Sequence, residues 1–149
     1  MLAVVGRSGV GKTHLIESLL RLLRESAVKV ATVKHTHHPV FEDKVGTDTD
    51  RHRRAGAHLS ALSGPGFCTF FTDGELSFEQ VLCAAGSGAD LILVEGYKSQ
   101  SIRRIEVVRD EEPMLAADDR WMTVKSGQVS EVLDAILTLL ELDRSKPHG

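Results

Sequence analysis

The sequence has little of several features that would place a chain of this size in a special class. Its 149 residues include only two cysteines, Cys68 and Cys83, and these form no C-x-x-C pair. Because both stand in or beside apolar runs, we expect buried free thiols and not a disulfide or a metal site. This cysteine usage fits a reducing compartment, and the predicted location is the cytoplasm.

Long apolar runs, a signal segment and an excess of positive charge are missing as well. No run approaches the ~20 apolar residues that a membrane span needs, and no basic-then-apolar signal segment opens the chain. The formal net charge of −3 does not favour general nucleic-acid binding. With 42% hydrophobic residues and no repeat or long linker, residues 1–142 are expected to form one domain, with a frayed tail over 143–149.

The chain does contain a phosphate-binding loop pattern near its start. Residues 6–13 read G-R-S-G-V-G-K-T, which matches G-x-x-x-x-G-K-[ST], between a short apolar run and apolar residues at helical spacing. A strand, a glycine-rich turn and a helix N-terminus therefore converge on one anion site. The Lys12 ammonium group would reach the β- and γ-phosphates, and the Thr13 hydroxyl would bind Mg²⁺. The predicted nucleotide-binding residues of the loop are Gly6, Arg7, Ser8, Gly9, Val10, Gly11, Lys12 and Thr13.

Strand and helix patterns alternate along the rest of the chain. The helix after the loop is expected to reach residue 24, and the apolar strand over 28–33 completes a βαβ unit with parallel pairing. Further expected elements are a buried parallel strand within 90–96, strands over 105–108 and 121–124, β-rich pieces over 59–62 and 67–71, helices over 48–57 and 77–85, and a last helix capped by Ser130. The predicted fold is therefore α/β: a three-layer P-loop NTPase fold with a mainly parallel sheet, helices on both faces and a small β-rich insertion.

Two carboxylates are candidates for completing a Mg²⁺ site. Mg²⁺ that bridges the β- and γ-phosphates takes the loop hydroxyl and a carboxylate from the carboxyl edge of the sheet. Glu95 follows an apolar run, and Asp48 lies in the segment after the second strand. Glu95 also fits an ordinary strand end, and Asp48 fits a helix N-cap. The predicted metal-site residues are Thr13, Asp48 and Glu95.

Lysine and histidine side chains cluster directly after the second strand, at Lys34, His35, His37 and His38. Imidazoles suit Zn²⁺ and Ni²⁺, but no second cysteine or histidine cluster supplies a closed structural site. We expect Lys34 and the histidines to line a nucleotide or partner surface, with Lys34 and His35 among the cofactor-binding residues. Plain solvated loop residues are the alternative.

A run of arginines follows at Arg51, Arg53 and Arg54. Such a run is most often a charged helix face. Beside a phosphate loop, one of these guanidinium groups can also stabilise charge on the γ-phosphate. The predicted catalytic residues are Arg53, for this role, and Glu95, which would place the attacking water.

With these residues named, the chain resembles the MobB family, the molybdopterin-guanine dinucleotide biosynthesis adaptor proteins. The segments K-H-T-H-H at 34–38 and V-E-G-Y-K at 94–98 are far more specific than the phosphate loop alone. The resemblance covers residues 4–109 and further includes Val33, Asp43, Gly46, Asp48, Thr49, Arg53, A-G-A at 55–57, D-L-I-L at 90–93 and I-E-V-V-R at 105–109.

The resemblance implies a GTP-binding, weakly GTP-hydrolysing protein that assists the attachment of GMP to molybdopterin. It would act beside the guanylyltransferase that performs this chemistry and would help deliver the finished cofactor to molybdoenzymes. By the family pattern, the loop holds phosphates, and Asp48 and Glu95 belong to the Mg²⁺ and γ-phosphate region. The resemblance also implies a dimer, with the β-rich middle segments extending the sheet.

The oligomeric state and the hydrolysis rate are also predictable from the residues. The apolar segment over 59–71 carries Phe67, Phe70 and Phe71, which so small a chain does not easily cover, so a homodimer is expected. Hydrolysis of GTP should be slow, because nothing in the sequence supplies a complete hydrolytic set.

Two alternatives stay open. No N-K-x-D segment reads guanine, so ATP remains an alternative nucleotide and an ATP-dependent small-molecule ligase or kinase an alternative enzyme. A nickel metallochaperone GTPase, with His35, His37 and His38 as the cargo site, is the second alternative.

Overall fold

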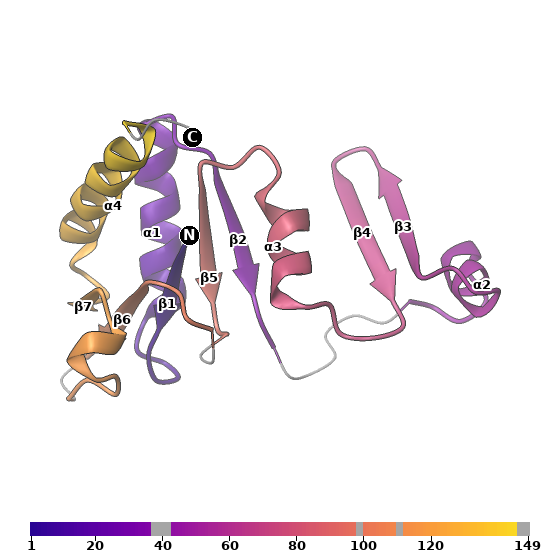
Figure 1. Cartoon of the computed structure of the whole chain (residues 1–149), viewed down its shortest axis with the longest axis horizontal. Helices are drawn as coiled ribbons and strands as arrows, with labels where there is room; N and C mark the ends of the chain where they lie inside the picture. The colour runs from indigo at the N-terminus through magenta and orange to yellow at the C-terminus, as the bar shows by residue number, and fades with distance from the viewer. Residues whose placement is uncertain (37–42, 98–99, 110–111, 146–149) are drawn as a thin grey trace. The chain divides into compact units, whose positions relative to one another are not determined.

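The structure is a computed structural model that describes residues 1–36, 43–97, 100–109 and 112–145 (Figure 1). The backbone divides into two compact units. One comprises Met1–His35 and Leu82–Gly149 and is called the sheet unit here; the other, Thr36–Val81, is called the hairpin unit. Whether residues 1–142 behave as one domain stays a prediction.

A five-stranded parallel sheet forms the centre of the sheet unit. Its strand order is β2-β5-β1-β6-β7, with β2 at Val30–Lys34, β5 at Leu91–Glu95, β1 at Leu2–Val5, β6 at Arg104–Val108 and β7 at Met122–Lys125. Every pair of neighbours is parallel, which confirms the predicted sheet. The direct pairing expected between β1 and β2 is wrong, because β5, the most apolar run, lies between them and pairs with both.

The core of the sheet unit lies between the sheet and two helices, α1 (Lys12–Glu25) and α4 (Val129–Arg144). Figure 1 shows the two helices side by side, and their buried residues pack into one apolar cluster with the strands. Leu15, Leu19 and Leu23 form the buried stripe of α1 and are fully inaccessible. Full burial of such a side chain stabilises a fold by about 1.5–3 kcal/mol. These contacts hold the start of α1 at the carboxyl edge of the sheet.

The opposite face of the sheet is also covered. Ile92 points to this face, and its side chain approaches Gly86 in α3 (Phe78–Gly86) so closely that a Cβ on Gly86 would lie 2.8 Å from it. Over β6, the fully buried Glu106 accepts hydrogen bonds from the backbone N–H groups of Met114 (2.6 Å) and Leu115 (3.2 Å). The guanidinium group of Arg120 lies 3.7 Å from the same carboxyl group. Helices therefore flank a central sheet, as predicted.

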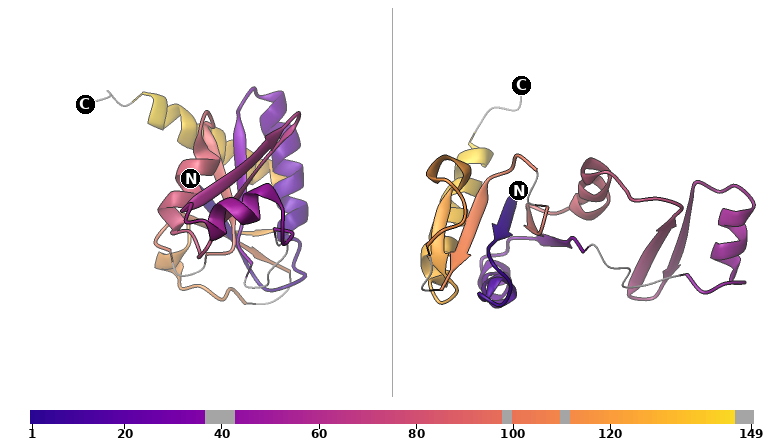
Figure 2. Two further views of the ribbon diagram at one scale, coloured as in Figure 1. Left: turned by 90° about the vertical axis from the view of Figure 1, so that its right-hand side faces the viewer. Right: turned by 90° about the horizontal axis from the view of Figure 1, so that it is seen from below.

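In the part of the hairpin unit that the structure describes, a short helix and two antiparallel strands precede the first residues of α3. Figure 2 shows α2 (Asp48–Arg54) beside the hairpin of β3 (Leu59–Gly64) and β4 (Phe67–Thr72). Two residues, Pro65 and Gly66, connect the strands, and Gly66 has φ +80°, the value that a type II turn needs at its third position. This is the small β-rich insertion that the sequence predicts.

The two cysteines are exposed, so the prediction of buried thiols is wrong. Cys68 lies on β4, where a two-stranded hairpin leaves side chains without a covering layer. Cys83 lies on an outward position of α3. An apolar neighbourhood in sequence predicts burial only where a second layer packs on the element.

Several helix ends differ from the expected ones. The capping box of α3 is confirmed: Ser77 N–H donates to Gln80 Oε1 (2.8 Å) and Gln80 N–H donates to Ser77 Oγ (3.2 Å). Ser130, in contrast, lies inside α4, whose N-cap is Gln128. Likewise the N-cap of α2 is Thr47, whose hydroxyl accepts from Asp50 N–H, and not Asp48. The helix α4 continues through residue 144 and thus includes the first residues of the predicted tail.

Candidate phosphate-binding site

The phosphate loop connects β1 to α1, as the sequence predicts. Three of its residues, Gly6 (φ +144°), Gly9 (φ +77°) and Gly11 (φ +101°), have backbone conformations that side-chain-bearing residues rarely adopt. Gly11 is the N-cap of α1 and supplies no side-chain acceptor, so the first N–H groups of the helix have no side-chain cap. These N–H groups at the positive end of a 14-residue helix form a ready anion site.

Neighbouring strands enclose the loop closely. A Cβ on Gly6 would collide with the carbonyl oxygen of Val107 in β6, and a Cβ on Gly11 would lie 2.6 Å from the Cβ of Ser126, which follows β7. The ends of β6 and β7 therefore fix the course of the loop, and both glycines are needed for this approach as well as for their φ angles.

Two long basic side chains bond to carbonyl groups of the loop. The Lys12 ammonium group donates to the carbonyls of Gly6 (3.1 Å) and Arg7 (2.7 Å). The Arg109 guanidinium group, from the residue after β6, donates to the carbonyl of Gly9 (2.8 Å). These bonds turn the carbonyl groups of the loop toward Lys12 and Arg109 and away from an anion that the loop N–H groups would bind. Sequence reasoning did not assign a role to Arg109, although it closes the I-E-V-V-R segment.

A cavity of about 240 Å³ opens beside the loop at the carboxyl ends of β1, β2 and β5. Its lining combines loop residues with strand ends: Val4, Val5, Gly6, Ser8, Lys12, His35, Glu95 and Gly96. The Glu95 side chain is 16% exposed, and one of its oxygens lies 3.7 Å from the Lys34 ammonium group. The structure therefore brings the predicted residues Gly6, Ser8, Lys12, His35 and Glu95 to one cavity, with Lys34 beside it.

The donors and acceptors present here fit a nucleotide phosphate with Mg²⁺. Phosphate oxygens need N–H donors and a cation, which the helix start and Lys12 supply. Mg²⁺ prefers oxygen ligands. The Glu95 carboxylate lines the cavity, and the hydroxyl group of the exposed Thr13, the second residue of α1, is a further candidate oxygen ligand. Of the eight predicted loop residues, Gly6, Ser8 and Lys12 line this cavity. The roles of the other five at a nucleotide stay predictions.

Asp48 and Arg53 belong to the hairpin unit. The Asp48 side chain is 88% exposed and lies 3.8 Å from the guanidinium group of Arg51. Arg53 is only 17% exposed, and its guanidinium group donates to Asp43 (3.1 Å) and to Asp73 (3.0 Å) and lies 5.9 Å from the centre of the Phe71 ring. Their predicted roles at the nucleotide stay predictions.

The carboxylates around Arg53 have perturbed acidities. Desolvation opposes ionisation of Asp43, but hydrogen bonds from Thr47, Thr49 and Arg53 outweigh it and lower the pKa of Asp43 below its usual value. The pKa of Asp50 is lowered chiefly by the hydrogen bond from the Gly46 N–H group, and then by that from Arg54. The pKa of Arg53 is raised, first by its hydrogen bond to Asp43. These groups form a charged network inside the hairpin unit.

The predicted histidine cluster is only partly described. His35 lies at the end of β2, while His37 and His38 fall outside the described residues. Within the described ranges, no three His, Cys, Asp or Glu side chains gather as a metal-binding group. In the same part of the chain, no helix is long and apolar enough to cross a lipid bilayer.

The fold and the loop together define a protein of the phosphate-loop α/β class. The chain belongs to the MobB family: the family model described as "Molybdopterin guanine dinucleotide synthesis protein B" matches residues 1–127. This confirms the family to which the sequence segments point.

Individual relatives agree with this assignment. The molybdopterin-guanine dinucleotide biosynthesis adapter protein of Escherichia coli K12 is 32% identical over 145 residues, which cover 92% of this chain and 83% of the relative. A relative from Methanocaldococcus jannaschii is 34% identical over 95% of this chain, but the chain spans only 61% of that protein's length. The crystal structure of Bacillus subtilis MobB shares the fold, with a TM-score of 0.62 at 20% identity over 92% of this chain and 95% of that one.

Proposed function

We propose that this chain is an adapter in molybdopterin-guanine dinucleotide biosynthesis that binds GTP with Mg²⁺ at the phosphate loop. The relatives bear the adapter name, and the observation that supports nucleotide binding is the uncapped start of α1 beside Lys12. In this proposal the adapter acts beside the guanylyltransferase of the pathway and then beside molybdoenzymes, in the cytoplasm, with molybdopterin or its guanine dinucleotide as a further ligand.

Different residues of the sheet unit have separate roles at the nucleotide. Backbone N–H groups of the loop and the Lys12 ammonium group hold the phosphates, and Thr13 and Glu95 supply oxygen ligands for Mg²⁺. Bound Mg²⁺ would neutralise phosphate charge. Glu95, at the strand end that faces the cavity, would also orient water. Asp48 is the second carboxylate that the proposal assigns to the metal region.

Turnover by the isolated chain should be slow. A cation on the developing γ-phosphate charge is worth 10³–10⁵ in rate where it is supplied. Arg53 could fill this role only by exchanging its bonds to Asp43 and Asp73 for a phosphate. A residue from the partner enzyme is the alternative, and docking on that partner would then complete the cycle. Turnover of ~1 s⁻¹ or faster by the chain alone, in the ordinary enzyme range, would contradict the adapter proposal.

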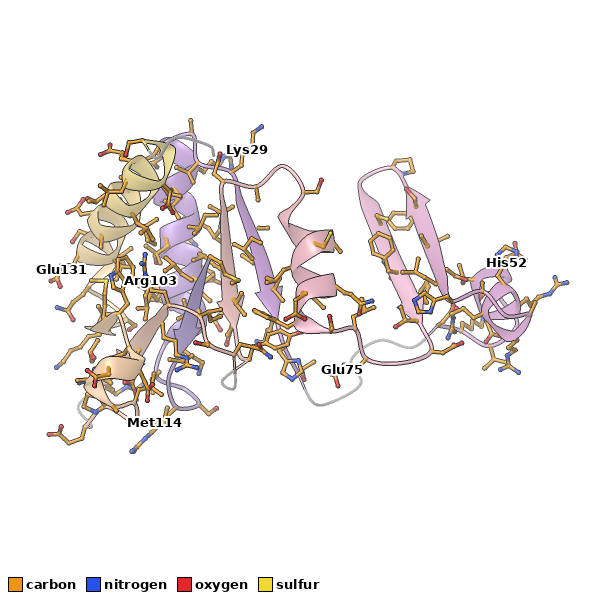
Figure 3. The ribbon with its side chains drawn as sticks, in the orientation of Figure 1. Lys29, His52, Glu75, Arg103, Met114 and Glu131 are labelled. Atoms are coloured by element: carbon orange, nitrogen blue, oxygen red, sulfur yellow. The ribbon has the colours of Figure 1, made fainter. Side chains whose placement is uncertain are left out.

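Calorimetric titration of GTP, ATP and GDP with Mg²⁺ tests nucleotide binding. Lys12→Ala should weaken GTP binding about tenfold or more, because a lost charge-assisted bond costs ~1.5–3 kcal/mol. Lys29→Ala is the matched control, since Lys29 lies just before β2, at the end opposite Lys34 (Figure 3). Equal affinity of wild type and Lys12→Ala would show that the loop binds no phosphate, and a preference for ATP would favour a ligase or kinase.

We propose in addition that the chain forms a homodimer through the hairpin unit. Leu59, Leu62, Phe67 and Phe70 are each 41–51% exposed, which is a large apolar area for two strands. The register of the hairpin places Leu59 and Phe70 on one face and Leu62 and Phe67 on the other, so a second copy packed on either face would cover two of these side chains. Sedimentation at micromolar concentration should give a dimer mass for wild type and a monomer mass for Phe67→Ser with Phe70→Ser. A monomeric wild type would refute the dimer.

A further inference from the structure

Tyr97, the residue that follows Gly96 after β5, has an unusual backbone conformation. Its φ is +49°, and Gly96 before it has φ +104°. Among the described residues the other non-glycine with positive φ is Ala27 (φ +56°), which directly follows the C-cap of α1, where left-handed residues are ordinary. Tyr97 follows a strand, so no helix end explains it. A bulky residue in this region carries a backbone cost that the surrounding structure must offset, and such residues concentrate at functional sites.

The conformation places the Tyr97 ring on His35. The two ring centres are 4.3 Å apart, with an angle of 32° between the ring planes. Gly96 permits this approach, because a Cβ there would lie 3.0 Å from the Cβ of His35. The N–H group of His35 also donates to the carbonyl of Glu95 (2.9 Å). The ends of β2 and β5 are thus joined through backbone and ring contacts around His35.

His35 lines the same cavity as Lys12, Ser8 and Glu95. In the strand order, β5 separates β2 from β1, so His35 stands at the far end of this cavity from the loop. Because the loop lysine reaches the β- and γ-phosphates, the cavity beyond it lies on the side of the terminal phosphate. An imidazole here can donate a hydrogen bond to a γ-phosphate oxygen but not to a diphosphate.

We infer that Tyr97 is a positioning residue that holds the His35 imidazole at the terminal-phosphate end of the cavity, so that this pair distinguishes a nucleoside triphosphate from a diphosphate. The inference rests on the proposed nucleotide binding. In this inference the backbone cost at Tyr97 is retained because the ring contact restricts the orientation of the His35 imidazole. The imidazole is then already oriented before the nucleotide binds, so binding of the triphosphate does not carry the entropic cost of ordering this side chain.

Variants at Tyr97 test this role through the GTP-to-GDP affinity ratio. Tyr97→Phe keeps the ring and should keep the ratio. Tyr97→Leu should lower GTP affinity about fivefold, the size of one lost hydrogen bond, and leave GDP affinity within twofold. Tyr97→Gly relieves the backbone and should show the same GTP loss with no loss of thermal stability, which separates positioning from folding.

A double-mutant cycle and NMR complete the test. If Tyr97 acts through His35, Tyr97→Leu should cost nothing further in a His35→Gln background. The His35 imidazole proton signals, assigned with that variant, should shift in Tyr97→Leu when the aromatic ring is lost. Additive losses of GTP affinity in the double mutant, or an unchanged GTP-to-GDP affinity ratio in Tyr97→Leu, would overturn this inference and leave the proposed function intact. Failure of wild type to bind any nucleotide would overturn the proposed function and this inference with it.

Discussion

Different kinds of interaction stabilise the interiors of the two units of this chain. In the sheet unit, leucine, isoleucine and valine side chains between sheet and helices are almost fully buried. In the hairpin unit, by contrast, Asp50 and Ser60 are buried while Leu62, Phe67 and Phe70 are about half exposed, and an arginine bonded to two aspartates occupies the interior. Apolar burial resists changes of pH, whereas an ionic network depends on them. The site stands on the first kind of unit, which suits a loop whose N–H groups must stay in place.

Truncation of one leucine in each unit should give the largest difference between the two units. Leu93 is 1% exposed in β5, so Leu93→Ala should cost about 2–5 kcal/mol of the free energy of unfolding. Leu62 is 48% exposed in β3, and Leu62→Ala should cost less than about 1 kcal/mol. Urea denaturation followed by circular dichroism, at a concentration where both variants are monomeric, measures both losses. Equal losses would mean that the hairpin side chain is as well packed as the core.

Acid should loosen the hairpin unit before the sheet unit. The pKa values of Asp43 and Asp50 are lowered in the folded state, so their stabilisation is complete above the unfolded value of ~3.9 and is lost as the pH falls below it. Amide exchange read by NMR from pH 6 down to pH 3 should show earlier loss of protection in β3 and β4 than in β1 and β5.

Two variants control the acid experiment. Asp43→Asn should weaken the hairpin unit already near neutral pH, because it removes a charged partner of Arg53. Asp48→Asn removes an 88% exposed carboxylate on α2, the helix that carries Arg53, and should change the stability little. If the sheet unit lost protection first, the assignment of pH dependence to the hairpin network would be wrong.

The smallest expected effect concerns a backbone position in the sheet unit. Ala27 has φ +56° after α1, a conformation that glycine adopts without the steric cost of a Cβ. Ala27→Gly should therefore raise the free energy of unfolding by about 0.5–1 kcal/mol. Ala31→Gly, within β2, should lower it by a similar amount, because glycine weakens a strand. Thermal or urea denaturation of the pair checks the opposite signs; a destabilised Ala27→Gly would contradict this account.

Local sequence was sufficient for the elements that local physics determines. The loop glycines, the leucine stripe of α1 and the capping box at Ser77 each specify structure within a few residues, and all three are present as predicted. The position of β5 between β1 and β2 was not predictable in this way. An apolar run shows that a strand is buried, but it does not show which strands it pairs with.

The parts of the site that sequence reasoning missed depend on residues distant in the chain. Arg109 bonds to Gly9 across 100 residues, and nothing near either residue indicates the contact. Tyr97 follows a glycine, but only the structure shows its positive φ and the His35 ring against it. The partners of Arg53 illustrate the same limit: an arginine on a helix predicts a charged face, and Asp73 approaches it only through the hairpin.

The buried carboxyl group of Glu106 has a consequence for the order in which the chain assembles. Its hydrogen-bond partners, Met114 and Leu115, come later in the sequence than β6, on which it stands. A carboxyl group buried without partners is costly, so β6 cannot reach its final environment until the segment that follows it has closed over the sheet. During synthesis, β1 can therefore pair with a fully packed β6 only after residues near 115 have been made. The phosphate loop is among the first segments made. Because its Gly6 packs against the carbonyl of Val107 in β6, the loop takes its final shape only after β6 is in place.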